Sequence, residues 1–290
     1  MSPFVADPVY LNGRFVPLAE ATISPLDRGF LFGDGVYEVI PVYSRRPFRL
    51  GEHLHRLQSS LDGIRLANPL PREEWETVVQ RLALDAPFED QGIYLQVSRG
   101  ADVKRDHIFP QGIPPTVFAF SSPLVTPAAA IRETGVCAIT AEDNRWLRCD
   151  LKTVSLLANV LLRQAADDQG CAEALLIRDG FLQEGAASSI FVVRNGILLA
   201  PPKSHLMLPG ITYDVVLELA DRHGQPYEIR EIPLAELQAA DEIWMTSSTK
   251  EVLPITRLDG RPVGTGAPGP VGRQMWQWYQ HFKTTVMRNG

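Results

Sequence analysis

The amino-acid sequence predicts an α+β protein of two domains. Its 290 residues are enough for two domains or one large one. Strand patterns and helical patterns come in separate groups instead of alternating regularly, which favours α+β over a wound parallel sheet. Residues 121–130 contain two prolines and mostly small side chains. We therefore expect a small N-terminal α+β domain at 1–120, a linker at 121–130 and a large C-terminal domain at 131–290.

The N-terminal part opens with a hairpin. Strand segments 9–11 and 14–16 flank Asn12-Gly13, a pair that tolerates the positive φ angles of a tight turn. Gly33-Asp34-Gly35 indicates a second turn. Apolar residues recur at helical spacing over 52–67, which predicts a helix. The other elements expected here are strands at 36–43, 47–50, 92–98 and 116–120 and a helix at 72–84.

The C-terminal part predicts two hairpins and a set of helices. The hairpin 174–183 turns at Arg178-Asp179-Gly180, and the hairpin 190–200 turns at Arg194-Asn195-Gly196. We expect these hairpins to form one antiparallel meander. A helix is predicted over 153–169. The remaining elements are strands at 136–140 and 243–246, helices at 210–222 and 272–287, and a hairpin turn at 258–261.

Composition excludes several classes of protein. A net charge of −6 disfavours nucleic acid as the main partner. No stretch of about 18 uncharged apolar residues is present, so we expect no transmembrane helix. The N-terminus lacks the basic start and apolar core of a signal peptide. Cys137, Cys149 and Cys171 have no metal-ligand spacing and are expected to be reduced thiols in a cytoplasmic protein.

Two residues carry the candidate chemistry. Lys152 stands where an irregular or extended segment passes into the predicted helix, and Glu184 stands where a strand pattern is interrupted by small residues. A lysine held in a pocket can form a Schiff base with a carbonyl group. A carboxylate in the same pocket can hold a pyridinium nitrogen protonated. Together they indicate pyridoxal phosphate chemistry.

The segments around these residues resemble a known family. Arg145–Thr153, Glu184–Phe191 and Glu52–Leu57 are similar to segments of the fold-type IV pyridoxal-phosphate enzymes, the branched-chain and D-amino-acid aminotransferases. The resemblance runs from about Asp27 to about Ile255. It implies two domains with pyridoxal 5'-phosphate in the cleft between them, bound in the larger one, and a homodimer. It also implies that Lys152 is catalytic.

The same resemblance implies the cofactor-binding residues. Glu184 would hold the pyridine nitrogen, and Leu208 would lie against the ring. Gly210 precedes a predicted helix, whose first amide groups and partial positive charge suit an anion. The phosphate would be held by Arg56, Ile211, Thr212, Ser247 and Ser248. At the segment after Glu184, this chain has Ala187-Ser188-Ser189 where the family often has Ser-Ser-Asn.

We predict no metal site. His53 and His55 are two residues apart on a predicted helix, so their side chains point to different faces.

The segment Ser98–Pro110 discriminates between members of the family. It resembles the loop of D-amino-acid aminotransferases, in which an R-x-H pair binds the substrate carboxylate, and here Arg105 and His107 fill those positions. The resemblance implies that this loop reaches into the active site of the neighbouring subunit, where Tyr37 completes the carboxylate site. Arginine suits this role because its planar fork presents two parallel donors.

The resemblance therefore implies a D-amino-acid aminotransferase. D-alanine and 2-oxoglutarate would give pyruvate and D-glutamate by a ping-pong mechanism. Two alternatives within the fold are a branched-chain L-amino-acid aminotransferase and an (R)-amine transaminase or aminodeoxychorismate lyase. A third, from another class, is a cofactor-binding carrier or structural protein, which the presence of both Lys152 and Glu184 disfavours.

Overall fold

In the computed structural model, residues 4–289 are described, and they form two compact units. The first unit takes the described chain up to Val125, the segment Leu151–Leu156 and the residues from Val286 onward. The second takes Thr126–Asp150 and Leu157–Thr285. The first boundary falls inside the expected linker. The short segment Leu151–Leu156 joins the N-terminal unit, which a division into consecutive domains did not predict.

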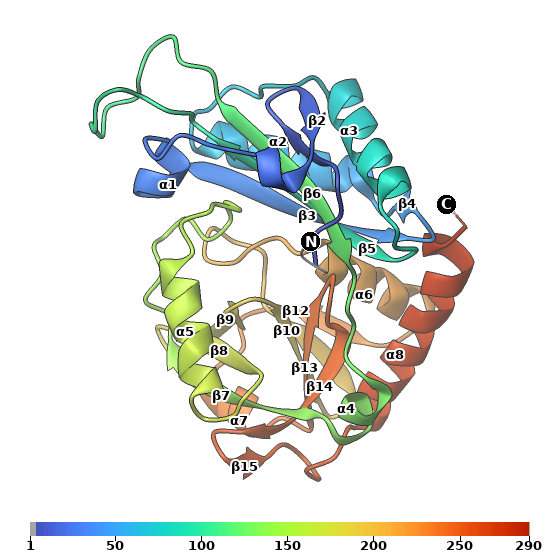
Figure 1. Cartoon of the computed structure of the whole chain (residues 1–290). Helices are drawn as coiled ribbons and strands as arrows, with labels where there is room; N and C mark the ends of the chain where they lie inside the picture. The colour runs from blue at the N-terminus through green and yellow to red at the C-terminus, as the bar shows by residue number, and fades with distance from the viewer. Residues whose placement is uncertain (1–3, 290) are drawn as a thin grey trace. The chain divides into compact units, whose positions relative to one another are not determined.

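The first unit is built on a sheet that has six strands among residues 4–289, in the order β2-β1-β6-β5-β3-β4. All neighbouring pairs in it are antiparallel. Its strands are β1 (Val9–Leu11), β2 (Arg14–Val16), β3 (Gly35–Tyr43), β4 (Arg46–Pro47), β5 (Gln91–Ser98) and β6 (Thr116–Pro123). Its helices are α1 (Arg28–Phe32), α2 (Leu50–Gly63) and α3 (Arg72–Asp85), with a 3-10 turn at Leu18–Glu20. Figure 1 shows α2 and α3 beside this sheet.

The core of the first unit lies between the sheet and these two helices. Val36 and Ile40 point inward from β3 with the two-residue period of a strand. Leu57 and Leu61 meet them from α2, and Trp75 from α3, all with at most 1% of their surface exposed. The same inward face of β3 also carries Glu38, a buried carboxylate among apolar neighbours.

The second unit is built on a sheet that has nine strands within the described chain. Its order is β12-β11-β10-β13-β14-β7-β8-β9, with β15 paired to β14. The pairs β11–β12, β14–β7 and β7–β8 are parallel, and the others are antiparallel. The strands are β7 (Val136–Glu142), β8 (Glu173–Arg178), β9 (Phe181–Gly185), β10 (Ser189–Arg194), β11 (Ile197–Ala200), β12 (Tyr227–Ile229), β13 (Glu242–Ser247), β14 (Glu251–Leu258) and β15 (Arg261–Pro262).

Helices flank this second sheet (Figure 1). They are α4 (Ala129–Thr134), α5 (Leu157–Asp167), α6 (Ile211–Arg222), α7 (Leu234–Gln238) and α8 (Pro270–Phe282), followed by a π-helical turn at Lys283–Met287. Among residues 4–289, no helix is long and apolar enough to cross a membrane.

The two predicted hairpins of this unit both form, as β8–β9 and β10–β11. The prediction that they continue into one meander is wrong, because β13, β14 and β7 lie between β10 and β8 in the sheet. Strand order depends on pairings between distant segments, and hairpin signals report only neighbours in sequence.

Two predicted boundaries also move. The helix expected over 153–169 begins at Leu157, because the residues before it pair with β3 of the first unit. The linker expected at 121–130 is shorter, since β6 continues to Pro123 and α4 begins at Ala129.

Candidate active site

Lys152 is held as an extra piece of strand beside β3. Its backbone carbonyl accepts a hydrogen bond from the Tyr37 N–H at 2.9 Å, and its own N–H donates to Ser60 Oγ at 3.1 Å. Thr153 forms an isolated bridge with Val36. The Lys152 Nζ lies 4.1 Å from the centroid of the Tyr37 ring. The position of the lysine is therefore set by backbone bonds that do not involve its side chain.

Tyr37 belongs to a row of aromatic side chains on the sheet face opposite the core. Its ring stacks on Tyr94 at 5.6 Å, and Tyr94 stacks on Phe120 at 5.1 Å. Burial raises the pKa of Tyr94 to about 12, and its hydroxyl donates to Gln96. The row comes from β3, β5 and β6, whose register brings these outward positions together.

Arg56 is paired with a buried carboxylate. Its Nε and Nη2 donate to Glu38 Oε1 and Oε2 at 2.7 and 2.8 Å, and His53 Nδ1 is 2.9 Å from Oε2. Burial alone would raise the pKa of Glu38, but Arg56 and His53 outweigh it and lower the pKa to about 2. Burial lowers the pKa of His53, so its neutral ring donates through Nδ1.

The structure places the two histidines of this helix on different faces, as the spacing predicts. His53 is buried and His55 is exposed. The Nε2 atom of His53 is buried without a hydrogen-bond partner among the described residues.

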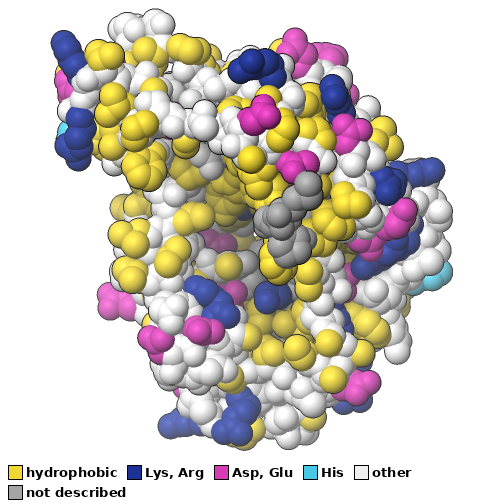
Figure 2. Space-filling model, viewed as in Figure 1, with side chains coloured by type: hydrophobic (Ala, Val, Ile, Leu, Met, Phe, Trp, Pro, Cys, Tyr) yellow, Lys and Arg dark blue, Asp and Glu magenta, His cyan; other side chains and the backbone are white. Residues whose placement is uncertain are grey.

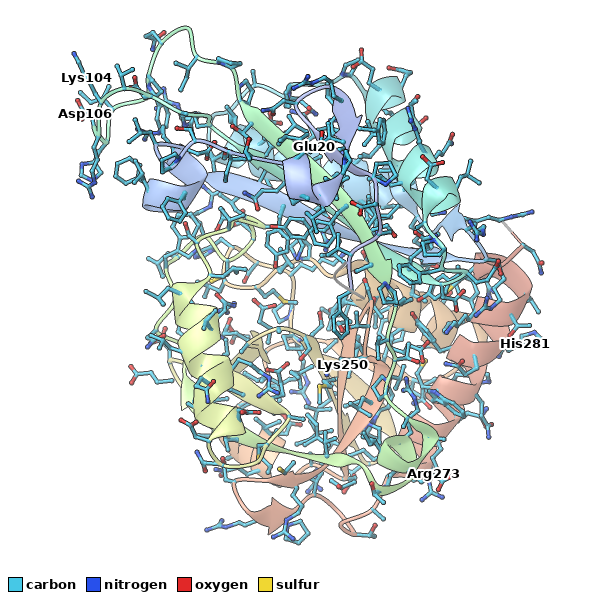
Figure 3. All side chains as sticks on the ribbon, in the orientation of Figure 1. Glu20, Lys104, Asp106, Lys250, Arg273 and His281 are labelled. Carbon is cyan, nitrogen blue, oxygen red and sulfur yellow. The ribbon has the colours of Figure 1, made fainter. Side chains whose placement is uncertain are left out.

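The loop with Arg105 and His107 projects from the first unit, and Figure 3 shows Lys104 and Asp106 at its tip. Both Arg105 and His107 are exposed and lie against Phe32, with the Arg105 guanidinium 5.0 Å and the His107 ring 5.3 Å from the Phe32 centroid. The two predicted carboxylate-binding side chains thus meet at one aromatic ring.

Buried Arg28 anchors this loop. Its guanidinium donates to the backbone carbonyls of Asp106 and His107 and to Asp34 Oδ2. Asp34 also accepts two hydrogen bonds from Arg99 at the start of the loop. Burial would raise the pKa of Asp34, but Arg99 and Arg28 lower it, so the carboxylate stays charged between them.

In the second unit, Glu184 is buried near the end of β9. Its Oε1 accepts hydrogen bonds from Arg145 Nη1 at 2.6 Å and from the Leu208 N–H at 3.1 Å. Burial raises the pKa of Glu184 to about 7, although Arg145 opposes the rise. The next residue is Gly185, and a larger side chain does not fit there, because a Cβ would lie 2.4 Å from Ser188 Oγ.

The predicted phosphate-binding residues gather at the start of α6 and the end of β13. Ile211 and Thr212 are the first residues of α6, so their N–H groups are among those without a partner in the helix. Ser189 Oγ lies against Gly210, where a Cβ would be 2.8 Å away. Ser189 pairs with Thr246 across β10 and β13, which places the turn with Ser247 and Ser248 nearby.

Hydrogen bonds from neighbouring groups hold the turn that contains Ser247 and Ser248. Ser247 Oγ accepts from the Lys250 N–H, and Arg132 donates to the carbonyls of Lys250 and Val252. Arg132 Nη2 also pairs with Glu251 at 2.7 Å.

These groups fit pyridoxal phosphate. The second unit brings together a buried carboxylate, Glu184, and helix-terminal N–H groups with serine hydroxyls, which suit a ring nitrogen and a phosphate respectively.

Sequence reasoning missed Arg145, Glu38 and Ser189. Glu38 had a detectable signal, because it is an acidic residue at a core-facing position of an apolar strand.

Comparison with known proteins identifies the family. The family model for amino-transferase class IV matches residues 35–258. The chain belongs to the class IV aminotransferases. Its solved structural relatives share the fold: the branched-chain amino acid aminotransferase from Escherichia coli superposes with a TM-score of 0.86 at 25% identity over 98% of this chain and 95% of that one. The α+β fold of this aminotransferase is therefore that of the fold-type IV enzymes.

Relatives of known activity extend along almost the whole aminotransferase chain. The D-alanine aminotransferase of Bacillus licheniformis is 40% identical over 92% of this chain and 94% of its own. That of Staphylococcus epidermidis is 37% identical over 94% and 97%. The T.th. branched-chain amino acid aminotransferase solved with pyridoxamine 5'-phosphate has a TM-score of 0.87 at 28% identity, covering 98% of this chain and 95% of that one. The sequence-based identification of the family is confirmed.

Proposed function

We propose that this aminotransferase uses pyridoxal 5'-phosphate to exchange D-alanine and 2-oxoglutarate for pyruvate and D-glutamate. Relatives named D-alanine aminotransferases match it over more than nine-tenths of its length, which supports the choice of substrate. The observation that carries the D-amino-acid assignment is the meeting of Arg105 and His107 at Phe32. A guanidinium and an imidazole together on an exposed loop suit a carboxylate.

The cofactor, when bound, supplies an electron sink that makes the Cα proton of the amino acid acidic. Lys152 Nζ would take the Cα proton as a base and afterwards donate a proton as an acid. Glu184 would hold the ring nitrogen protonated. The phosphate would be held by Arg56, Ile211, Thr212, Ser247 and Ser248, and Leu208 would pack against the ring.

The hand of the substrate follows from where its carboxylate is held. The backbone bonds of Lys152 to Tyr37 and Ser60 fix the point from which its side chain extends, so the amine reaches the substrate from one direction. The enantiomer that directs its Cα hydrogen at this amine depends on the side of the pocket where the carboxylate is bound. Arg105 and His107, with Tyr37, therefore select D-amino acids.

We also infer that the enzyme is a homodimer whose carboxylate site is completed by the loop of the neighbouring subunit. Leu157, Val160 and Leu161 form one face of α5, since they are three and four residues apart, and their exposed fractions are 72%, 58% and 60%. Trp146 and Leu147, in the same unit, are also exposed. Figure 2 shows hydrophobic side chains on the surface over α5. Exposed apolar side chains grouped on one helix face support an interface there.

A cytoplasmic location completes the proposal. All three cysteines are free thiols, which suits a reducing compartment.

The test is the visible absorption spectrum of the purified enzyme with pyridoxal phosphate, recorded with D-alanine and, in a parallel sample, with L-leucine. Loss of the cofactor band with D-alanine alone supports the proposal. Loss with L-leucine alone would move the enzyme to the branched-chain group, to which several of its structural relatives belong. Reaction with an (R)-amine lacking a carboxylate would identify an (R)-amine transaminase, and pyruvate release without an oxo-acid acceptor would identify a lyase.

The dimer is tested separately by light scattering of the wild-type protein and of Leu161→Glu. A dimer that becomes a monomer in the variant supports the interface on α5. A wild-type monomer would contradict it.

A further inference from the structure

Arg145 connects Glu184 to a chain of buried charges in the second unit. Nη1 donates to Glu184, Nε and Nη2 both donate to Asp143 at 2.8 and 3.0 Å, and Nη2 also reaches the Leu206 carbonyl. Only 6% of the Arg145 side chain is exposed. Each nitrogen of the guanidinium therefore has a specific acceptor, so the group has one orientation.

Asp143 is in turn held by a second arginine. Arg178 Nη2 lies 3.1 Å from Asp143 Oδ2 and donates to the Arg145 carbonyl at 2.8 Å. The Asp143 N–H donates to the Ile177 carbonyl, next to Arg178 on β8. Burial would raise the pKa of Asp143, but Arg145 and Arg178 lower it. Two carboxylates and two guanidiniums thus alternate in the order Glu184, Arg145, Asp143, Arg178.

This chain also sets the position of the segment at Leu208. Glu184 accepts from the Leu208 N–H on the same oxygen that accepts from Arg145, while Arg145 donates to the Leu206 carbonyl. The two backbone groups lie on either side of Met207, so one ion pair fixes both ends of this short segment. A movement of Arg145 would therefore displace the carboxylate and Leu208 together.

We propose that Arg145, braced by Asp143 and Arg178, is a positioning residue that favours the ionised form of Glu184 and orients this carboxylate for the ring nitrogen of the cofactor. This rests on the proposed function of Glu184. Arg145 has no assigned contact with substrate, and its effect passes through the carboxylate. A protonated Glu184 could not stabilise a protonated ring nitrogen, so the enzyme would bind its cofactor with a weaker electron sink.

The electrostatics of the site agree with this role. Burial is the largest influence on the pKa of Glu184 and raises it to about 7, against the opposing charge of Arg145. Asp143 adds to the rise in the pKa of Glu184, and Arg178 acts on Asp143. Burial raises the pKa of the Cys149 thiol to about 11, so it stays neutral near pH 7. Loss of Arg145 would leave Glu184 beside Asp143 without its compensating cation.

The experiment compares Arg145→Met and Arg145→Lys with a matched control, Arg194→Met. Arg194 lies in the same unit and pairs with Asp241, but it is 39% exposed and outside this charge chain. We expect Arg145→Met to lower kcat on the order of 10- to 100-fold, as outer partners of site residues commonly do, with little change in KM for D-alanine. Arg145→Lys should recover part of the loss, and the control should match wild type.

A second readout follows the proton on Glu184 itself. Infrared spectra of the full chain, labelled with ¹³C-glutamate and titrated from pH 5 to pH 9, report the protonated carboxyl group, and Glu184→Gln identifies its band. We expect the midpoint to move to higher pH in Arg145→Met and to return towards wild type in Arg145→Lys. An unmoved midpoint in Arg145→Met would overturn the proposal.

A double variant decides whether Arg145 acts through Glu184. In a Glu184→Gln background, Arg145→Met should add less than about threefold to the loss of kcat, because its target is already neutral. If the loss of kcat in the double variant equals the product of the losses in the two single variants, the proposal is overturned. If Arg145→Met does not fold, Arg178→Met and Arg178→Lys carry the same test, with a smaller effect in the same direction.

Failure of the proposed function can be distinguished from failure of the proposal for Arg145. An enzyme that does not turn over D-alanine would contradict the proposed function in the wild type. The infrared midpoints and the dissociation constant for pyridoxal phosphate would still report on Arg145 in that case.

Discussion

Arg56 and Glu38 form a two-point ion pair inside the first unit, in which both carboxylate oxygens accept from one guanidinium. None of the Glu38 side chain is exposed, and 11% of Arg56 is. A guanidinium carries five N–H donors, so an arginine in such a pair can also contact a phosphate, and for Arg56 that contact stays a prediction. The pair fixes the side chain on the face of α2 that also carries Ser60, the partner of Lys152.

Glu38→Gln should destabilise the protein in a pH-dependent way. The folded-state pKa of Glu38, about 2, is below its ordinary value of 4.5, so its stabilisation is present above about pH 4.5 and is lost as pH falls through 2. The shift corresponds to about 3 kcal/mol at neutral pH. Urea unfolding of wild type and variant, measured from pH 6 down to pH 2, should show a difference that shrinks with acid. Exposed Glu89→Gln is the control, and a constant difference for Glu38→Gln would contradict the pairing.

Lys152→Ala should abolish transamination and leave the fold intact. The backbone bonds to Tyr37 and Ser60 do not need the side chain, so unfolding temperature and circular dichroism should stay near wild type. Activity is measured by pyruvate release from D-alanine. Lys203→Ala, a surface lysine paired with Asp214, should remain active. Substantial turnover by Lys152→Ala would remove the lysine from its catalytic role.

Arg105→Ala should weaken binding of D-amino acids. Loss of a charge-assisted hydrogen bond costs about 1.5–3 kcal/mol, which corresponds to a KM increase of roughly 10- to 150-fold. The affinity for pyridoxal phosphate should not change. Lys104→Ala is the matched control, because Lys104 is an exposed cation on the same loop (Figure 3). Equal KM values for Arg105→Ala and wild type would place the carboxylate site elsewhere.

Arg28→Met should raise KM for D-alanine, as Arg105→Ala does, although Arg28 is buried. Without its donors to the carbonyls of Asp106 and His107, the loop loses its anchor, so KM for D-alanine should rise severalfold. Amide hydrogen exchange should become faster in residues 103–109 and stay unchanged in β5.

The exposed Arg14→Met is the control for Arg28→Met, and Arg28→Lys tests whether a shorter cation suffices. Unchanged exchange in the loop together with a raised KM would show that Arg28 acts by another route.

Local periodicity was sufficient to predict most of the elements. Segments such as β3, α3 and α6 have strand or helix patterns that their own residues decide, and their bounds differ by little from those expected. The start of α5 could not be found this way. Residues 153–156 continue the apolar pattern, but the backbone around Lys152 and Val154 bonds to Tyr37 and Gly35, more than a hundred residues earlier.

Lys152 and Glu184 could be proposed from the sequence because one residue type in one segment carries the chemistry, and their roles stay predictions. The site was not predictable where a charge acts through a distant partner. Arg145 lies 39 residues from Glu184 in sequence, and Arg28 lies about 80 residues from the carbonyls that it holds. Such pairs are created only when strands from separate hairpins and loops are brought together.

The position of Leu151–Leu156 limits how this polypeptide can be divided. Within the described residues the chain passes from one unit to the other four times, after Val125, Asp150, Leu156 and Thr285. Neither unit is therefore a continuous stretch of gene. A fragment ending at the linker would lack the segment that carries Lys152. A chimaera joined there would take Lys152 from one parent, and Tyr37 and Ser60, which bond to its backbone, from the other. Recombination between such enzymes can preserve this contact only when both parents supply matching surfaces.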